Sequence, residues 1–277
     1  KDESEANVNL GIGQLGFEPG SIFKVITEAI ALNEGLINMD DTFYCSGEIC
    51  SNGGKSYAHG KLTVNQAFEV SCNDIFAKIG QMIGYEKMLK YTTNLGLYNK
   101  VLGLAGENRE EAIGVMAKPS DGISNFAIGQ CITVTPLQIA GAINAVVNDG
   151  IYIKPSLIEA IVDEENNVIE SIQNEENRIF TSTTSVKNSM YDVIWEGTGS
   201  AAKIEGITQG GKTGTSTGEG GATTHGWFAG YFELNDKMYT LVVVAPNING
   251  VDANGNDLGG GNTAAPIYRD IIKSLME

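Results

Sequence analysis

The sequence predicts an α+β fold, in which an antiparallel sheet is flanked by helices and joined to a helical lobe. Helical periodicity dominates the first half of the chain, whereas strand-like patterns gather near the end, at 226–232 and 238–245. The 277 residues contain no internal repeat and no low-complexity linker. We therefore expect a single domain over 1–277. Its expected parts are an α/β lobe at about 1–44 and 132–277 and a helical lobe at about 62–131.

Two helices are predicted near the front of the chain. The first begins near Ser21, because Pro19 and Gly20 precede a helical run of apolar residues that ends before Gly35. The second covers 64–83, where apolar residues recur at helical spacing. Both helices are expected to bury one apolar face.

A third helix has the clearest end signals. Thr135 is its expected N-cap, Pro136 its first residue, and Gly150 follows its last apolar residues. The later elements are predicted in this order: short strands at 157–162 and 167–172, a helix at 182–196 capped by Ser182, a hairpin of 226–232 and 238–245, and a closing helix at 264–276.

Charge and hydropathy exclude several classes of function. Asp and Glu number 34 against 18 Lys and Arg, so the net charge is −16 and no basic cluster reverses it locally. Such a surface repels the phosphate backbone of nucleic acids and anionic lipid. No apolar run is long enough to span a bilayer, and the chain does not open on a signal-peptide pattern. Any export signal or anchor is expected upstream of residue 1.

Ser21 and Lys24 place a hydroxyl and an amine three residues apart, on one face of the first predicted helix. A helix N-terminus favours negative charge on the serine oxygen, and a lysine in apolar surroundings has a lowered pKa and can accept the serine proton. Most such pairs lie on the surface, but the apolar residues around Lys24 favour a desolvated amine. The pair is predicted to be a nucleophile and its base.

Ser71 and Asn73 flank Cys72 inside the second predicted helix, where Ser and Asn are intrinsically unfavourable. One interpretation is a local turn between two helices. The other is a functional motif in which Ser71 relays a proton and Asn73 contacts a substrate amide.

The run Lys212-Thr213-Gly214-Thr215 follows two glycines, which let a backbone edge approach another peptide closely. A plain Gly-rich turn is the simpler interpretation. Gly206 completes the spacing of a phosphate-binding loop, but the segment 214–224 is too rich in Gly and Thr for the helix that such a loop requires.

Together these motifs resemble those of class B penicillin-binding proteins, the peptidoglycan D,D-transpeptidases. Ser-x-x-Lys, Ser-x-Asn and Lys-Thr-Gly occur in family order, with 50 residues from Ser21 to Ser71 and 141 from Ser71 to Lys212. The likeness runs through nearly the whole chain and includes further segments: Glu18-Pro-Gly-Ser-Ile-Phe-Lys24, Ile128-Gly-Gln130, Val134-Thr-Pro-Leu-Gln-Ile-Ala140, Asn148-Asp-Gly150, Glu196-Gly-Thr-Gly199 and Ala264-Ala-Pro266.

The resemblance implies roles for four residues in the chemistry. Ser21 corresponds to the acylated nucleophile and Lys24 to its general base. Ser71 corresponds to a residue near the proton path, and Asn73 to one near the peptide stem. No cofactor is implied for this serine chemistry.

It also implies roles for the third motif. Lys212 and Thr213 correspond to residues that hold the substrate carboxylate or its β-lactam mimic, with Gly214 beside them. The backbone N–H groups of Ser21 and Thr215 correspond to an oxyanion hole, which stabilises charge that appears only in the transition state.

The implied reaction is acyl transfer on D-Ala-D-Ala stem peptides of peptidoglycan, with acylation and inhibition by β-lactam antibiotics. The implied partner is a cell-wall glycosyltransferase complex. The implied location is the extracytoplasmic face of a bacterial cell membrane, with an N-terminal anchor absent from this chain. Division, elongation and sporulation enzymes share these motifs.

Three other functions of the same fold stay open. A D,D-carboxypeptidase differs in letting water attack the acyl-enzyme. A serine β-lactamase of class A carries a Glu-x-x-Leu-Asn string between the second and third motifs, and no such string occurs between Ser71 and Lys212. A non-catalytic β-lactam sensor binds the drug covalently and signals, although Lys24, Asn73 and Lys212 together favour catalysis.

Two departures from the family pattern stand out. The family usually has a strand pair before this helix, but only twenty residues precede Ser21. We expect those strands to belong to a segment outside this sequence, and the sheet to lack one edge. Cys131 stands where the family commonly has Gly, and we expect a small buried thiol there.

Cys45, Cys50 and His59 follow a C-x4-C-x8-H spacing that suits a structural zinc ion. A local disulfide or two idle thiols are equally compatible with the spacing. His225 is expected at the edge of the cleft rather than as a ligand. The residues considered for the fourth zinc ligand are Asp40, Asp41, Glu48 and His225.

Overall fold

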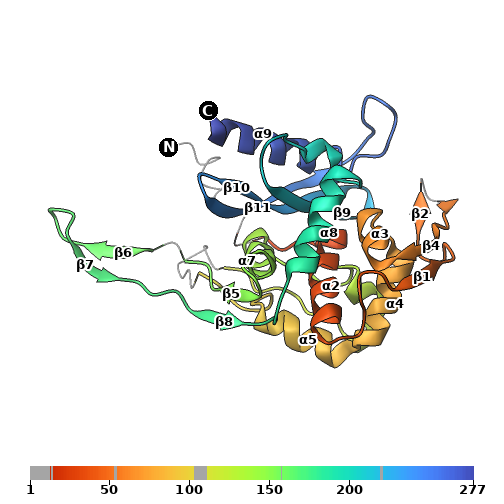
Figure 1. The fold of residues 1–277 in the computed structure, drawn as a ribbon, viewed down its shortest axis with the longest axis horizontal. Coiled ribbons are helices and arrows are strands. Elements are labelled where there is room, and N and C mark those ends of the chain that lie inside the picture. The colour runs from red at the N-terminus through yellow and green to blue at the C-terminus, as the bar shows by residue number, and fades with distance from the viewer. Residues whose placement is uncertain (1–12, 14, 53–54, 103–110, 157, 219–220) are drawn as a thin grey trace.

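The computed structural model describes residues 13, 15–52, 55–102, 111–156, 158–218 and 221–277. Its main sheet is antiparallel with the strand order β11-β10-β9 and lies between helices on its two faces (Figure 1). The mixed α+β class predicted from the sequence is confirmed. The sheet consists of β9 (Gln209–Thr217), β10 (Thr224–Leu234) and β11 (Lys237–Ile248).

The predicted hairpin is longer than expected because its turn is only two residues long. Asn235 and Asp236 join β10 to β11 with φ values of 52° and 59°. Asn and Asp tolerate this left-handed conformation, and a two-residue turn of this kind matches the twist of the flanking strands. The register therefore pairs Leu234 directly with Lys237.

Alternate residues of β10 serve two separate cores. Phe228 and Phe232 pack with Tyr268 of the closing helix α9 (Ala264–Met276), at ring distances of 4.5 and 6.5 Å. Trp227 and Tyr231 point to the opposite face and join the larger core of the helical layer. This period of two explains why 226–232 is apolar throughout: the strand is covered on both faces.

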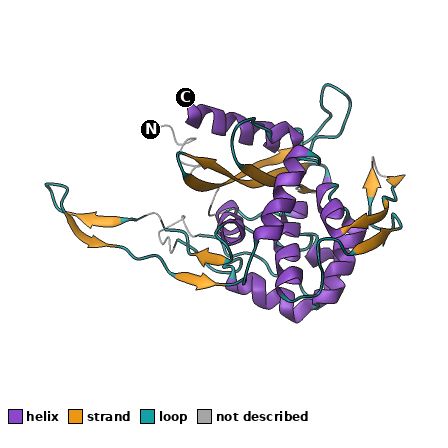
Figure 2. Cartoon of the chain, in the orientation of Figure 1, coloured by secondary structure: helices purple, strands orange, loops and turns teal. Residues whose placement is uncertain are grey.

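The helix at the centre of that layer is α2 (Lys24–Asn33), preceded by the 3₁₀ turn η1 (Gly20–Phe23). Residues 24–31 are all buried, and α2 contacts α4, α5, α7 and α8. Figure 2 shows these helices gathered on one side of the sheet. A helix enclosed in this way places Lys24 inside the molecule, whereas Ser21 in the preceding turn is half-buried.

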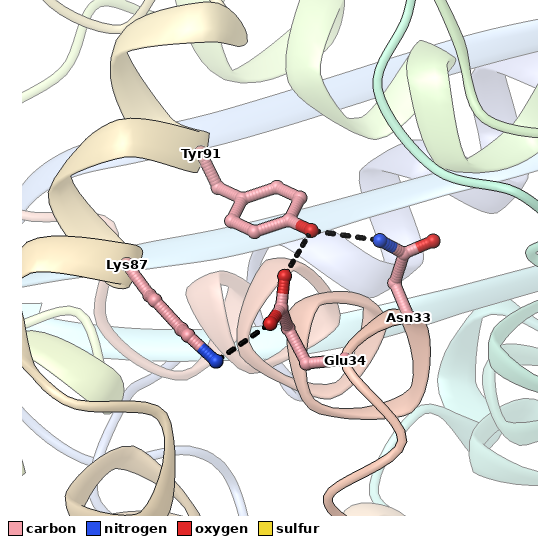
Figure 3. A network of polar contacts seen from close by, with 4 residues as sticks. All are labelled: Asn33, Glu34, Lys87 and Tyr91. Carbon is pink, nitrogen blue, oxygen red and sulfur yellow. Dashed lines mark hydrogen bonds and ion pairs between the residues drawn. The ribbon is translucent and has the colours of Figure 1, made fainter.

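A polar network fixes the far end of α2 to α5 (Tyr85–Asn94) (Figure 3). Glu34 pairs with Lys87 at 2.6 Å and accepts a hydrogen bond from the Tyr91 hydroxyl at 2.6 Å, while Asn33 donates to the same hydroxyl. The contact with Lys87 lowers the pKa of Glu34. The network anchors α2 at the end opposite Ser21.

The single helix predicted at 64–83 is wrong: the segment forms two helices, α3 (Val64–Glu69) and α4 (Asn73–Ile83). Ser71 lies between them with φ 57°, a left-handed conformation that ends a helix. The turn interpretation and the functional interpretation of the Ser-x-Asn motif are therefore compatible.

The third predicted helix is confirmed as α7 (Pro136–Val147), with Thr135 and Gln138 forming a reciprocal capping box. The helix expected from Ser182 begins later, as α8 (Thr184–Trp195), with Thr183 at the N-cap position. Ser182 is thus not its cap.

The two strands expected around 157–172 form a hairpin arm that projects away from the body (Figure 1). They are β6 (Ala160–Val162) and β7 (Val168–Ser171), while Leu157 lies outside the described residues. The other elements are β1 (Thr42–Cys45), β2 (Ser51–Asn52), β3 (Lys55–Ser56), β4 (Gly60–Thr63), η2 (Pro119–Asp121), α6 (Ile123–Ala127), β5 (Ile151–Ile153), β8 (Glu176–Arg178) and η3 (Ser200–Ala202).

The expectation for Cys131 is wrong, because its side chain is exposed and its φ is 61°. Glycine adopts this conformation without steric cost, which gives a physical reason for the usual residue at this position. In this chain the Cys131 N–H donates to the Glu18 carboxylate at 3.0 Å, and that bond holds the turn beside Ser21.

We expect Gly129→Ala to destabilise the protein and to misplace Ser21. At φ 77°, a Cβ there would collide with the Gly20 carbonyl and with the Cβ of Phe23, so the loop before Ser21 must move. Gly122→Ala is the matched control, because Gly122 has φ 84° but nothing within 4 Å of an added Cβ. Thermal unfolding should show a loss of about 1–2 kcal/mol for the control and a larger loss for Gly129→Ala. Equal losses would contradict the steric argument.

Candidate active site

Ser21 lies in η1 at the wall of a cleft of about 730 Å³. The preceding Gly20 has φ +55°, and a Cβ on it would meet the Thr215 carbonyl oxygen at 2.5 Å. The Gly20 N–H donates to the Gly129 carbonyl at 3.0 Å. Close backbone approach on both sides therefore holds Ser21 against the edge strand β9.

Lys24 Nζ joins the first two motifs. It lies 3.1 Å from Ser21 Oγ and 3.1 Å from Ser71 Oγ, and it donates at 2.6 Å to both the Ser71 carbonyl and the Asn73 amide oxygen. Those last two oxygens can only accept. A neutral amine has two N–H bonds and one lone pair, so the lone pair is left for a serine hydroxyl.

Burial gives this amine the character of a base. Lys24 is fully buried, and desolvation lowers its pKa from 10.5 to about 7, although the nearby thiols of Cys72 and Cys50 act in the opposite direction. A general base is most effective when its pKa lies near the working pH. The geometry and the pKa therefore both suit transfer of the Ser21 proton to Lys24.

The third motif lies on β9, along the opposite wall. Lys212 is fully buried, whereas Thr213, Gly214 and Thr215 line the cleft together with Ser21. The Thr213 hydroxyl bonds to that of Thr198 at 2.7 Å. An open row of hydroxyls and backbone beside a buried lysine suits a carboxylate ligand.

A loop after β11 forms part of the cleft wall. That this loop lines the cleft was not predicted from the sequence. Asp252, Asn256 and Asn262 all line the cleft. Asp252 accepts from the Asn256 N–H at 3.0 Å and from Asn262 Nδ2 at 3.2 Å, and these bonds lower its pKa to about 2. The Asx pattern Asp-x-Asn-x-Asn, which begins at residue 252, is the signal that predicts such a compact turn.

Cys45, Cys50 and His59 come together as predicted, and Cys72 completes the cluster. Cys45 Sγ lies 3.7 Å from Cys50 Sγ and 3.4 Å from His59 Nδ1, and Cys50 Sγ lies 3.6 Å from Cys72 Sγ. A tetrahedron with metal–sulfur bonds of about 2.3 Å has edges of about 3.8 Å. The four atoms are thus spaced to hold a metal ion.

The residues considered for the fourth ligand are therefore wrong. His225 is not at the cleft edge either: it is buried against Phe17 and accepts the Asn247 N–H at 3.1 Å. Cys45 and Cys50 are free thiols rather than a disulfide. The sequence did contain a signal for the fourth ligand, because a third cysteine, Cys72, lies inside the Ser-x-Asn motif.

Asp74 holds the loop that carries Cys45 and Cys50. Its carboxylate accepts backbone N–H groups, among them those of Gly47 at 2.8 Å and Ile49 at 2.6 Å. These bonds lower its pKa despite partial desolvation. The Asp74 N–H in turn points at Cys50 Sγ, at 3.4 Å. These contacts hold the backbone that presents Cys45 and Cys50.

Taken together, a desolvated lysine beside a serine at a helix start, a second serine on the same amine, and a buried lysine on an edge strand define a serine acyl-transfer enzyme. The model of the family "Penicillin binding protein transpeptidase domain" matches residues 3–273. The chain belongs to this family of penicillin-binding protein transpeptidase domains.

Individual relatives agree with this assignment. Stage V sporulation protein D of Bacillus subtilis is 31% identical over 296 residues, covering 99% of this chain and 44% of that protein. A peptidoglycan D,D-transpeptidase FtsI homolog of Mesostigma viride is 28% identical, covering 94% of this chain and 49% of that protein. The chain thus spans about half the length of these curated relatives.

Solved structures give the same fold. The crystal structure of penicillin binding protein 3 from Mycobacterium tuberculosis complexed with aztreonam has a TM-score of 0.79 at 25% identity, covering 96% of this chain and 63% of that one. A D,D-transpeptidase domain from Eggerthella lenta has a TM-score of 0.79 at 22% identity, covering 99% and 70%. Among the described residues, no helix has both the length and the hydropathy needed to cross a membrane.

The rate of acylation of Ser21 should rise with pH through about 7. As the expected base, Lys24 can accept the serine proton only when it is neutral, and its lowered pKa puts that change near pH 7 rather than above 10. Stopped-flow measurement of β-lactam acylation across this range checks it. A rate that rises only at the ordinary lysine pKa would show that burial does not activate Lys24.

Proposed function

We propose that this chain is the catalytic domain of a peptidoglycan D,D-transpeptidase, acting on D-Ala-D-Ala stem peptides and inhibited by β-lactams. One observation carries the proposal: Lys24 Nζ contacts Ser21, Ser71 and Asn73 at once, in a setting that lowers its pKa. Ser21 and Ser71, expected from the sequence as nucleophile and relay, therefore both contact the amine of Lys24, the expected base.

The first half-reaction transfers the acyl group to Ser21. The Ser21 hydroxyl gives its proton to Lys24 Nζ while Oγ bonds to the carbonyl carbon between the two D-Ala residues. The tetrahedral intermediate then collapses, the C–N bond breaks, and the leaving D-Ala amine takes a proton. Ser71 Oγ, at 3.1 Å from Lys24 Nζ, is placed to relay that proton from the lysine to the amine.

In the second half-reaction an amine of a neighbouring stem peptide attacks the ester. Its proton passes through the same serine and lysine to Ser21 Oγ, which restores the enzyme. The backbone N–H groups of Ser21 and Thr215 are proposed to hold the oxyanion of both intermediates. The close approach of Gly20 to the Thr215 carbonyl oxygen brings these two segments side by side.

The carboxylate of the terminal D-Ala is proposed to bind along β9, between Thr213 and Lys212. Thr198 supports this site through its 2.7 Å bond to Thr213. Asn73 faces the same cleft and can contact the peptide stem through its amide. The predicted lobes at 1–44 with 132–277 and at 62–131 would then meet at the cleft.

Intact mass spectrometry with benzylpenicillin tests the chemistry. We expect one persistent adduct on Ser21 and none on the folded Ser21→Ala variant, because the other hydroxyl beside Lys24, that of Ser71, is proposed as the proton relay and not as the nucleophile. An adduct that is retained by Ser21→Ala would refute the nucleophile. Rapid loss of the adduct with destruction of the drug would indicate a β-lactamase instead.

A donor peptide ending in D-Ala-D-Ala separates transpeptidation from its alternatives. Formation of a cross-linked product with an added acceptor amine supports the transpeptidase, whereas release of D-Ala with water as the only acceptor indicates a D,D-carboxypeptidase. Stem peptides place the proposed site of action at the extracytoplasmic face of a bacterial membrane, next to the glycosyltransferase that makes the glycan strands.

We also propose that Cys45, Cys50, His59 and Cys72 hold a structural zinc ion. Three sulfur atoms and one imidazole nitrogen within 4.8 Å of one another match a closed Cys₃His set. Burial raises the pKa of the Cys50 and Cys72 thiols, so without a cation they stay protonated. An ion there would neutralise the thiolates and fix Cys72, and with it the turn that presents Ser71 and Asn73.

Elemental analysis of protein purified without chelator should find one zinc per chain. The Cys72→Ser and Cys45→Ser variants should lose the ion and melt at lower temperature, because metal binding contributes to folding. Cys131→Ser is the matched control, since that thiol is exposed and outside the cluster. Full zinc content in the cluster variants would refute the site.

A further inference from the structure

Two glycines let the segment 18–22 lie directly against β9. A Cβ on Gly20 would meet the Thr215 carbonyl oxygen at 2.5 Å, and a Cβ on Gly214 would meet the Pro19 carbonyl oxygen at 2.9 Å. Among the described residues, no backbone hydrogen bond joins this segment to the strand. The glycines therefore permit the close approach, but other contacts must hold it.

The main-chain carbonyl of Glu18 accepts two of these contacts. Ser216 Oγ of β9 donates to it at 2.5 Å, and Trp227 Nε1 of β10 donates to it at 2.9 Å. Both donors belong to buried residues, and a hydrogen bond in such surroundings is electrostatically stronger than in water. Two neighbouring strands of the main sheet thus fix the main chain three residues before Ser21.

The Glu18 carboxylate holds the turn on the other side of this segment. Its Oε1 accepts the Cys131 N–H at 3.0 Å, and the Gly129 carbonyl of the same turn accepts the Gly20 N–H at 3.0 Å. Cys131 has φ 61°, a conformation that is costly for a non-glycine residue and persists where its surroundings enforce it. A hydrogen bond to a carboxylate is stronger than one between neutral groups and suits that purpose.

We propose that Glu18 is a positioning residue that clamps Ser21 between β9 and the turn 129–131, and thereby sets the spacing of the two N–H groups proposed for the oxyanion hole. The inference rests on the proposed acyl transfer and deepens it. Glu18 is not one of the described residues that line the cleft, so it acts through the segments that it holds.

The two proposed N–H donors must meet at one oxygen atom, although Ser21 lies in η1 and Thr215 in β9. Charge develops on that oxygen only as the tetrahedral intermediate forms. A change in the spacing of the donors therefore raises the energy of the transition state more than that of the initial complex. A misplacement of about 1 Å in an active site can cost about 100-fold in rate. Loss of the clamp should slow bond formation without weakening the first binding step.

Stopped-flow acylation by benzylpenicillin tests this, because it separates the dissociation constant of the initial complex from the rate constant of acylation. In Glu18→Ala the rate constant should fall by about 10- to 100-fold, while the dissociation constant changes little. Glu18→Gln keeps a side-chain oxygen that can accept the Cys131 N–H, so its rate constant should return to near the wild-type value. A residue that served folding alone would produce neither the split nor the rescue.

Glu164→Ala is the matched control, because it removes one exposed carboxylate from the turn between β6 and β7, on the projecting arm (Figure 1). Both of its constants should equal those of the wild type. An unchanged rate constant in Glu18→Ala, equal losses in Glu18→Ala and Glu18→Gln, or parallel changes in both constants would overturn the role of Glu18 and leave acyl transfer intact. A wild-type protein that benzylpenicillin does not acylate would overturn the proposed function and this inference with it.

Ser216→Ala keeps the test decisive if Glu18→Ala does not fold. It removes the bond from β9 to the Glu18 carbonyl and leaves the bond from Trp227 and the contact with Cys131 in place. The acylation rate constant should again fall with little change in the dissociation constant, but by less than in Glu18→Ala because Trp227 still holds the oxygen. A wild-type rate constant in folded Ser216→Ala would refute the clamp.

Discussion

Desolvation of one amine, Lys24 Nζ, is the constraint on which the arrangement of the site depends. The amine is reached by η1, by the Ser71 turn and by the start of α4, and it contacts each of them through an oxygen. A lysine at this depth is tolerated because oxygen atoms order it, and it is useful because those oxygens carry no charge. The enclosure of α2 by helices on several sides is therefore a requirement of the chemistry as well as of packing.

The turn at Ser71 links the candidate active site to the cysteine cluster. A left-handed residue between α3 and α4 points both a hydroxyl and a carbonyl at Lys24, and the next residue, Cys72, points into the cluster. The same short segment is thus held at two points, by hydrogen bonds to Lys24 and by the thiol cluster. Movement at either point changes the position of the other, which makes the cluster part of the support of the site.

The sequence was sufficient to predict elements whose structure depends on residues close together in the chain. The Thr135-Pro136 start of α7 needs only a capping box, and the three motifs keep their family spacing. Local sequence signals were insufficient to predict features that depend on contacts between residues far apart in the chain. The apolar period of 64–83 continues across the break at Ser71, and the fourth position of the Cys₃His set depends on how two loops fold together.

The β6–β7 arm differs from the rest of the molecule in how its backbone is held. Each of its strands pairs only with the other in the described part of the chain, whereas β10 is paired along both edges at the centre of the main sheet. Several apolar side chains of the arm, such as Val168 and Ile169, are more than 60% exposed. A two-stranded ribbon of this kind opens locally without unfolding the domain. Its amide hydrogens should therefore exchange with water long before those of β10, and we expect the arm to unfold independently of the candidate active site.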